Sequence, residues 1–315
     1  MDSVMLDPLD LRLLHALHLD GRAPFARIAE VLDVSDRTLA RRYARLRATG
    51  TARVTATVST RSTGHAEWLV RLRVRPGAAD LARALARRPD TAWVTVLSSG
   101  TEIVCVLRAL AGGPAPLAEL ARHPRILDVD AHRLLRHLMD HRWPGRTSAL
   151  TAGEIGALRP PDPGGSGPIA LNDLDRRLIP SLAADGRAPY PDLARRTGWS
   201  ESAVRRRVEE LRRSGTLRFD VEVEPVALGY AAQCLLWLTV PPSRLAGTVR
   251  DLAGDAETAF IGAVTGTHNL LAIAVCRNDD ALYAYMSQRL AALDGIERVE
   301  TALVTSYSKR VAPAH

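Results

Sequence analysis

The sequence has little lysine, and this shortage shapes its positive charge. Lys309 is the only lysine among 42 basic residues, so almost all of the positive charge is carried by arginine. Arginine suits bidentate contacts to phosphate or guanine, although an arginine bias also accompanies a GC-rich genome. Aromatic residues make up 4% of the chain, while the hydrophobic content of 46% is ordinary for a globular protein.

Cysteine and long apolar runs are also scarce. Cys105, Cys234 and Cys276 stand far apart in apolar segments, without a CxxC pair. This spacing argues against a disulfide framework and against a cysteine zinc site. No apolar run approaches the 18 or so residues of a membrane span, and the first residues carry acids where a secretory signal is basic. We therefore expect a cytoplasmic protein.

The chain repeats itself at a constant shift of 165 residues. A segment starting at Leu6 aligns without a gap with one starting at Leu171. The shift pairs Asp20-Gly21-Arg22-Ala23-Pro24 with Asp185-Gly186-Arg187-Ala188-Pro189. A repeat of this length indicates two copies of one unit.

The domain organisation follows from this repeat. We expect a first helix-turn-helix domain at 1–60, a first effector or assembly domain at 61–142, a linker at 143–168, a second helix-turn-helix domain at 169–228 and a second effector or assembly domain at 229–315. The linker is predicted from the proline and glycine density between Trp143 and Pro168.

Each copy begins with a pattern typical of three short helices. In the first copy, apolar residues at helical spacing end at Asp20-Gly21, Phe25 to Leu32 forms a second helix, and Ser35 is a good N-cap for a third helix from Asp36 to about Thr49. A tight turn between the second and third helices indicates a helix-turn-helix. The second copy repeats each element.

The third helices carry the candidate DNA-binding residues. Once the inward positions are assigned to the core, the remaining faces expose arginine and small polar residues, which suit phosphate and base-edge contacts in a major groove. The candidates are Ser35, Arg37, Thr38, Arg41, Arg42, Arg45, Ser200, Ser202, Arg205, Arg206 and Arg207. Residues 6–53 hold nine arginines and six acids, and 171–218 hold eleven and seven, which accounts for the whole net charge of +7. Double-stranded DNA is the expected partner.

The remainder of each copy predicts an α+β domain. In the first copy, strands are expected near 68–74, 92–97, 103–107 and 126–135, with helices near 78–86 and 116–122. In the second copy, strands are expected near 235–240, 258–264, 270–276 and 296–305, with helices near 243–253 and 280–293. The order βαββαβ is ferredoxin-like and leaves one sheet face for a partner to cover. We expect the protein to pair through that face.

This combination resembles the Lrp/AsnC family, the feast/famine regulators. The resemblance rests on the DGRAP segments, on the third helices SDRTLARRYARLRATG and SESAVRRRVEELRRSG, and on the βαββαβ domain known in that family as RAM, all present twice. It implies a sequence-specific DNA-binding transcriptional regulator rather than an enzyme, without a cofactor. It also implies a homo-oligomer, dimeric or higher, and a small effector such as an amino acid.

The resemblance further implies an effector-binding turn before the third strand of each α/β domain. The expected residues are Gly100, Thr101, Glu102, Gly266, Thr267, His268 and Asn269. The first turn is one residue shorter than the second, and Asn269 stands where the family pattern has an acid. The alternative is that these glycines only form hairpin turns.

A tandem duplication places two DNA-binding heads in one chain. We therefore expect a built-in pseudo-dimer whose heads lie about one helical turn of DNA apart, roughly 34 Å. Because the two third helices differ in sequence, we predict an asymmetric operator.

Three other functions are consistent with parts of the sequence. Siroheme decarboxylases resemble the same fold, but the stretch after the third helix that holds histidine in those enzymes has none here, at 217–225. Metal binding would have to use the pairs His15 with His18 or His137 with His141, which lack an obvious third ligand. A third alternative is an assembly protein that does not bind DNA. No catalytic triad, phosphate-binding loop or dinucleotide signature is present.

Overall fold

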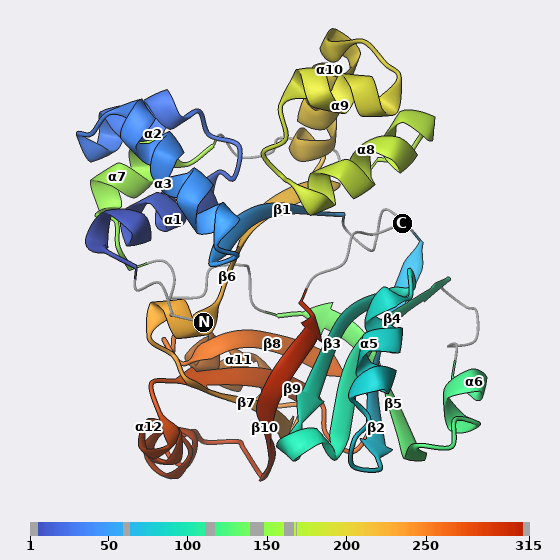
Figure 1. Ribbon diagram of the computed structural model, residues 1–315. Helices are drawn as coiled ribbons and strands as arrows, with labels where there is room; N and C mark the ends of the chain where they lie inside the picture. The colour runs from blue at the N-terminus through green and yellow to red at the C-terminus, as the bar shows by residue number, and fades with distance from the viewer. Residues whose placement is uncertain are drawn as a thin grey trace. The chain divides into compact units, whose positions relative to one another are not determined.

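The computed structural model describes residues 6–58, 64–110, 117–138, 148–160, 167 and 169–310. These residues form two compact units. The first holds the described parts of 6–58 and 148–229, and the second holds those of 64–138 and 230–310. Each unit therefore combines equivalent parts of both sequence copies (Figure 1).

The first unit is built from helices and one pair of strands. Its elements are α1 (Pro8–Leu19), α2 (Phe25–Leu32), α3 (Asp36–Ala48), β1 (Ala52–Val58), α7 (Ala152–Leu158), α8 (Asp173–Ala184), α9 (Tyr190–Thr197), α10 (Glu201–Arg213), β6 (Leu217–Val223) and the 3-10 turn η2 (Pro225–Leu228). We call α1–α3 the first head and α8–α10 the second head. The predicted helices of both heads are confirmed nearly to the residue.

The two heads are joined by an antiparallel sheet. β1 follows the first head, β6 follows the second, and they pair over their full length, from Ala52 opposite Val223 to Val58 opposite Leu217. The pairing buries apolar residues of one copy in the core of the other: Val221 lies in the first head's core, and Ala56 in the second's. Burial of apolar surface is the main favourable contribution to such an interface.

The segment between the copies contains a helix. Residues 143–168 are predicted to be a linker, yet α7 packs against α1 and α2 of the first head. Leu158 is fully buried there, and Thr151 and Glu154 form a capping box at the start of the helix. Residues 143–147, 161–166 and Pro168 lie outside the described residues.

The second unit is built from two four-stranded sheets with helices. Its elements are β2 (His65–Val74), α5 (Ala79–Arg87), β3 (Thr91–Leu97), the 3-10 turn η1 (Ser98–Gly100), β4 (Glu102–Leu110), α6 (Ala118–Ala121), β5 (Ile126–His137), β7 (Ala232–Thr239), α11 (Leu245–Ala253), β8 (Thr258–Val264), β9 (Leu270–Cys276), α12 (Asp279–Ala284), its π-helical continuation η3 (Tyr285–Leu290) and β10 (Arg298–Lys309). This order confirms the ferredoxin-like prediction for both copies.

The two sheets close on each other as one barrel. The strand order is β10-β3-β4-β2-β5-β8-β9-β7, closed by pairing of β7 with β10. The junctions between copies are β10 with β3 and β5 with β8. Apolar side chains from both copies, among them Leu69, Leu97, Leu235 and Trp237, fill one shared cluster. The sheet face that needs a partner is therefore covered by the second copy in the same chain.

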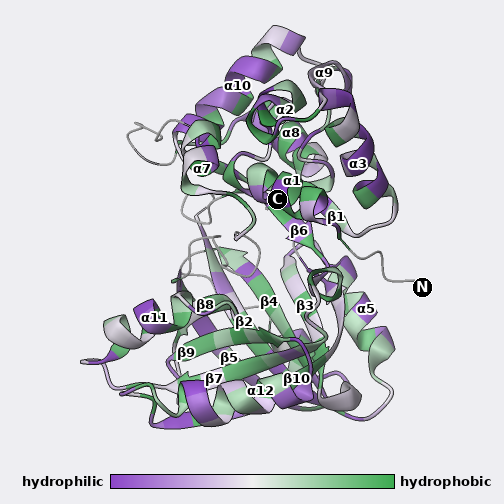
Figure 2. Ribbon diagram, turned by 90° about the vertical axis from the view of Figure 1, so that its left-hand side faces the viewer, coloured by the Kyte–Doolittle hydropathy of each residue, from purple (hydrophilic) through white to green (hydrophobic). Residues whose placement is uncertain are grey.

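Hydropathy follows this arrangement. Figure 2 shows hydrophobic residues along the strands of the second unit and hydrophilic ones along α3 and α10. Within the described residues, no helix has the length and apolar character needed to cross a bilayer.

Candidate nucleic-acid interface

The third helix of each head is fixed by a serine cap and an apolar stripe. The Ser35 hydroxyl accepts the Thr38 amide at 3.1 Å, and the Ser200 hydroxyl accepts the Ala203 amide at 3.3 Å. These contacts satisfy backbone donors that the helix itself cannot. The buried residues are those predicted to face inward: Leu39, Tyr43, Leu46, Val204, Val208 and Leu211.

Three predicted arginines are exposed and uncommitted. The side chains of Arg37, Arg41 and Arg206 form no hydrogen bond or ion pair with the described part of the chain. Arg41 and Arg206 occupy equivalent positions at the 165-residue shift. Unpaired guanidinium groups at one position of both heads are suited to bind phosphate or a base edge.

The other exposed candidates have local partners. Thr38 shares a hydrogen bond of 2.8 Å with Ser35, and Ser202 one of 3.1 Å with Ser200. Arg205 pairs with Glu201 at 2.8 Å and lies over the Tyr190 ring at 4.4 Å. Because its side chain is still 60% exposed, this pairing leaves it accessible to a ligand.

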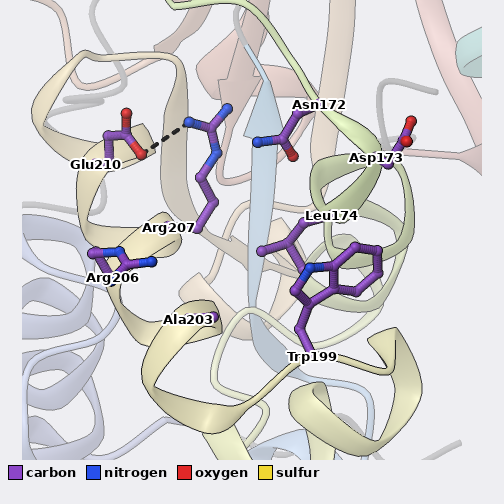
Figure 3. A pocket seen from close by; sticks show the side chains of 8 residues that line it. All are labelled: Asn172, Asp173, Leu174, Trp199, Ala203, Arg206, Arg207 and Glu210. Carbon is purple, nitrogen blue, oxygen red and sulfur yellow. Dashed lines mark hydrogen bonds and ion pairs between the residues drawn. The ribbon is translucent and has the colours of Figure 1, made fainter.

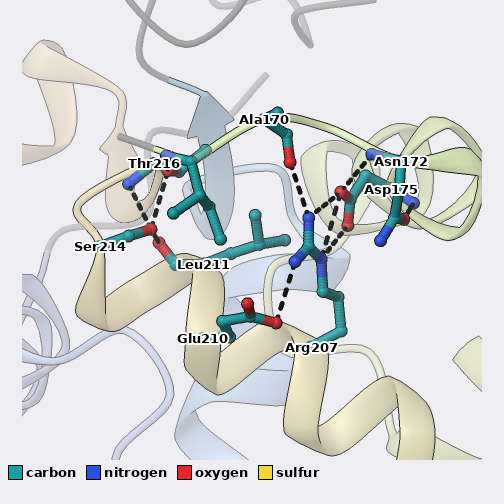
Figure 4. A network of polar contacts seen from close by, with 9 residues as sticks. Ala170, Asn172, Asp175, Arg207, Glu210, Leu211, Ser214 and Thr216 are labelled. Carbon is teal, nitrogen blue, oxygen red and sulfur yellow. Dashed lines mark hydrogen bonds and ion pairs between the residues drawn. The ribbon is translucent and has the colours of Figure 1, made fainter. Parts of the chain in front are cut away.

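Arg42 and Arg207, which are predicted to be free, are instead bound inside their heads. Arg42 pairs with Asp7 and, at 3.0 Å, with Asp10. Its counterpart Arg207 binds Asp175 at 2.6 Å and the Ala170 carbonyl at 2.9 Å, as Figure 4 shows. The hydrogen bond to Asp175 raises the pKa of Arg207. The prediction that these two arginines are unoccupied is therefore wrong.

Two buried aspartates explain this pairing. Asp10 and Asp175 are the N3 residues of the capping boxes that start α1 and α8, and both are fully buried. A buried carboxylate requires a charged or hydrogen-bonding partner, and an arginine of the third helix supplies it. In the first head Arg45 also binds Asp10, at 2.5 Å, and remains 47% exposed. These contacts tie the first helix of each head to the third.

The two heads hold each other through a reciprocal clasp of arginines that is not predicted from the sequence. Arg22 donates to the Gly186 and Ala188 carbonyls at 2.7 and 3.1 Å. Arg187 donates reciprocally to the Gly21 and Ala23 carbonyls at 2.7 and 2.9 Å. Burial lowers the pKa of both arginines. The DGRAP segments, which are predicted only to end one helix and start the next, thus form a second contact between the heads, beside the β1–β6 sheet.

Ion pairs and glycines complete the clasp. Arg47 pairs with Asp185 at 2.9 Å, and the equivalent Arg212 pairs with Asp20 at 2.8 Å. A Cβ atom on Gly21 would lie 2.7 Å from the Cβ of Phe219, and one on Gly186 would lie 2.8 Å from Val54 Cγ1. Only glycine fits at these approaches. The exact repetition of DGRAP at a shift of 165 was the available signal, because its partner is the other copy of itself.

The predicted effector turns are connected by a charged chain within the second unit. Glu102 binds Arg71 at 2.9 Å, Arg71 binds Glu300 at 2.7 Å, and His268 lies 3.3 Å from Glu300. The hydrogen bond from Arg71 lowers the pKa of Glu300. The two turns are thus linked through side chains of both copies.

Other residues of these turns are also engaged. The Asn269 side chain pairs with both the amide and the carbonyl of Val240, at 3.0 and 2.6 Å. Gly100 and Gly266 have φ of +91° and +107°, and a Cβ on Gly266 would lie 2.3 Å from His132 Nδ1. Thr101 donates to the Ser98 carbonyl, and the Thr267 carbonyl accepts from Thr239. This geometry accounts for the glycines as turn residues, the alternative left open by the sequence.

The candidate metal-binding histidines have protein partners. His15 Nδ1 accepts the Leu150 amide at 3.1 Å, His18 lies 3.2 Å from Asp220, and His137 lies 2.8 Å from Glu67. His141 lies outside the described residues. Over the part of the chain that is described, no three histidine, cysteine or acidic residues gather as a metal site would require.

Comparison with known families assigns both parts of the repeat. The AsnC-type helix-turn-helix domain model matches residues 6–47 and 171–212, and the Lrp/AsnC ligand binding domain model matches 233–312. An uncharacterized HTH-type transcriptional regulator of Pyrococcus abyssi is 32% identical over 142 residues, which are 45% of this chain and 90% of the relative. The HTH-type transcriptional regulator LrpA of Pyrococcus horikoshii is 24% identical over 135 residues, 42% of this chain and 96% of LrpA.

Among solved structures, the siroheme decarboxylase NirDL is similar over nearly the whole chain. The TM-score is 0.63 at 15% identity, covering 98% of this chain and 94% of the decarboxylase chain. At this identity the likeness shows a common fold. The duplicated helix-turn-helix match, the ligand-binding-domain match and the Pyrococcus relative together show that the chain belongs to the Lrp/AsnC family of transcriptional regulators, with its unit present twice.

Proposed function

We propose that this regulator binds one asymmetric double-stranded DNA operator with both heads of a single chain. The observation that carries the proposal is a pair of clasped heads that each expose an uncommitted arginine at the same helix position, Arg41 and Arg206. The clasp would hold the two third helices at a defined separation, as two half-sites on one duplex require.

The residues proposed to contact DNA lie on the exposed faces of α3 and α10. They are Ser35, Arg37, Thr38, Arg41 and Arg45 in the first head and Ser200, Ser202, Arg205 and Arg206 in the second. Arg42 and Arg207 are assigned to holding the first and third helices together.

The salt dependence of DNA binding tests this proposal. Each arginine that displaces a counterion from phosphate should contribute about one unit to the slope of log affinity against log salt. Arg37→Ala and Arg205→Ala, which remove exposed arginines proposed to contact DNA, should therefore each reduce the slope by about one unit. Arg83→Ala, which removes an exposed charge from α5 in the other unit, should leave it unchanged. Equal slopes in all four proteins would contradict the assignment, and failure of the wild type to bind DNA would contradict the function.

We also propose that a small effector such as an amino acid modulates this binding through the second unit. The match of 233–312 to a ligand binding domain supports it. Since His268 and Asn269 already have internal bonds, an effector that uses them must replace those bonds. Thermal melts with each of the twenty amino acids should show a raised midpoint for one or a few of them, and Asn269→Ala should abolish the shift. Twenty unchanged midpoints would contradict the proposal.

A homo-oligomer, dimeric or higher, is proposed as the assembled state. Val299 and Leu303 of β10 are 38% and 50% exposed, and exposed apolar side chains on a strand can serve as an interface. Light scattering after size exclusion should give a mass of at least two chains. A mass near 34.2 kDa at all concentrations would contradict it.

A siroheme decarboxylase-like enzyme is the alternative, favoured by the shared fold with NirDL. The stretch 217–225, which forms β6 and enters η2, contains no histidine. An absorbance titration with an iron tetrapyrrole distinguishes the two functions: a saturable Soret shift would favour the enzyme, and an unshifted band the regulator.

A further inference from the structure

The exposed faces of the two third helices differ in a way that changes their chemistry. At the 165-residue shift, Arg37, Thr38 and Arg45 of the first head correspond to Ser202, Ala203 and Glu210 of the second. Two long cationic side chains are thus replaced by a serine and an acid, and a threonine by an alanine. The turn before the helix also differs, because Trp199 stands where the first head has Val34.

In the second head Trp199, Ala203 and Glu210 border a pocket of about 390 Å³ between α8, α10 and the turn that precedes α10. Its lining consists of Asn172, Asp173, Leu174, Trp199, Ala203, Arg206, Arg207 and Glu210. Figure 3 shows the Trp199 indole beside Leu174, with Ala203 and Arg206 on the neighbouring α10. One wall is therefore apolar, and the adjoining wall carries a guanidinium group.

The indole is held in place. Trp199 is 37% exposed, and the Arg177 guanidinium lies 5.5 Å from its ring centre while donating to the Thr197 carbonyl at 3.3 Å. Trp199 directly follows Gly198, which ends α9 in a left-handed conformation with φ of +83°. A fixed aromatic surface can contact an apolar group of a ligand at little cost in conformational entropy.

The polar groups of the pocket differ in their availability. Arg207 is bound by Asp175 and Glu210, and Asn172 caps α8. Arg206 has no partner among the described residues, so it is the group that can bind a ligand. The carboxylates of Asp173 and Glu210 at the rim pair with Arg176 and Arg207, so they offset the positive charge that a phosphate site requires.

Base edges in the major groove match this set of groups. Arginine binds the O6 and N7 acceptors of guanine, apolar side chains contact the thymine methyl, and carboxylates accept from cytosine N4. We infer that the second head reads a guanine with Arg206 and the methyl group of an adjacent thymine with Trp199, Leu174 and Ala203. This inference rests on the proposed function, and it assigns a base preference to one head only.

Removal of single methyl groups from DNA tests the inference on the wild-type protein. The probe is the tightest duplex recovered from a random pool by the full-length chain, with each thymine replaced in turn by uracil. Arg206→Ala identifies the half-site whose sequence preference the second head determines. Replacing one thymine in that half-site should lower the affinity of the protein for the duplex about fourfold, the value expected for one buried methyl group.

Variants at Trp199 then locate the contact. In Trp199→Ala most of this effect should be lost, because the largest of the three apolar groups that contact the methyl is gone. Trp199→Val, which installs the residue of the first head, serves as a second variant should alanine unfold the head, as a thermal melt will show. Val34→Ala, the matched control in the first head, should keep the fourfold effect.

The outcomes separate the two proposals. If the wild type selects no duplex, the proposed function fails. If it binds a defined site but no thymine responds to loss of its methyl group, or if Trp199→Ala keeps the response, the inference fails and the proposed function stands. A uniform loss in Trp199→Ala that is independent of sequence would assign the pocket to the sugar-phosphate backbone and overturn the inference.

Discussion

The two heads share a scaffold and differ in the surface they expose. Each has a capping box with a buried aspartate, an arginine of the third helix bound to it, and a DGR segment that contacts the other head. The third helices carry different charge: α3 has five arginines and one acid, whereas α10 has five arginines and three acids. The aspartate, the arginine and the DGR segment of this shared scaffold are thus the same in both copies, whereas several exposed positions of the third helix differ.

A second difference concerns what supports each head. Among the described residues, α7 packs against the first head, through Leu158 and an ion pair of 2.5 Å between Arg12 and Glu154. His15 of α1 accepts the Leu150 amide next to α7, whereas the equivalent position of α8 is Pro180. The copies therefore form a pseudo-dimer whose halves are stabilised differently.

The largest expected effect comes from breaking the clasp that the heads share. Arg187→Met should lower the free energy of unfolding of the first unit by about 4 kcal/mol, because two buried carbonyls of the other head lose charged donors. Arg22→Met should have a similar effect, since its contacts are reciprocal. Denaturant unfolding measures both, with the exposed Arg196→Met as the control. Losses below about 1 kcal/mol would show that the clasp is not what joins the heads.

A somewhat smaller loss of stability should affect the first head and leave the second intact. Leu158→Ala should destabilise the first unit by about 3 kcal/mol, because it opens a cavity in the core of the first head. Under native conditions the Leu158→Ala protein should still contact the DNA half-site that is read by the second head, which is the one relaxed by Arg206→Ala. Footprinting measures the protection of that half-site, and denaturant unfolding measures the loss of stability. An unchanged unfolding midpoint would mean that α7 does not support the first head.

The smallest effect is a pH dependence that only the first head should show. Burial, together with the nearby His18, lowers the pKa of His15 from 6.5 to about 4. The folded state thus binds fewer protons than the unfolded state between these values, so stability is complete above pH 6.5 and falls as the pH drops toward 4.

Between pH 7 and pH 5 this histidine should account for a loss of about 2 kcal/mol. His15→Leu should be less stable at pH 7, where the Leu150 amide loses its acceptor, and should lack this part of the pH dependence. Unfolding at both pH values measures the difference. The same pH dependence in wild type and variant would assign the titration to other groups.

The local structure of the heads follows from the sequence because it is encoded by nearby residues. Ser35 and Ser200 cap helices that start at the next residue, and Leu39, Tyr43 and Leu46 define a stripe within one helix. The succession of strands and helices along the second unit also follows, since each strand is a short apolar run bounded by turn residues.

Contacts between residues that lie far apart along the chain could not be predicted from the sequence. The helical spacing places Arg42 on the exposed face of the third helix, and only its ion pair with Asp10, which lies 32 residues away, shows that it binds within the head. Arg22 contacts carbonyl groups 164 and 166 residues away. For α7, flanking proline and glycine hid a short helix that is stabilised by packing on the first head.

We propose that two diverged heads, clasped in one chain, bind one asymmetric duplex. The decisive experiment is selection of bound duplexes from a random pool by the full-length chain, repeated with Arg41→Ala and with Arg206→Ala. We expect two different half-sites about one helical turn apart, each relaxed by only one of the two variants. Recovery of strictly palindromic sites, or of sites that both variants relax alike, would contradict it.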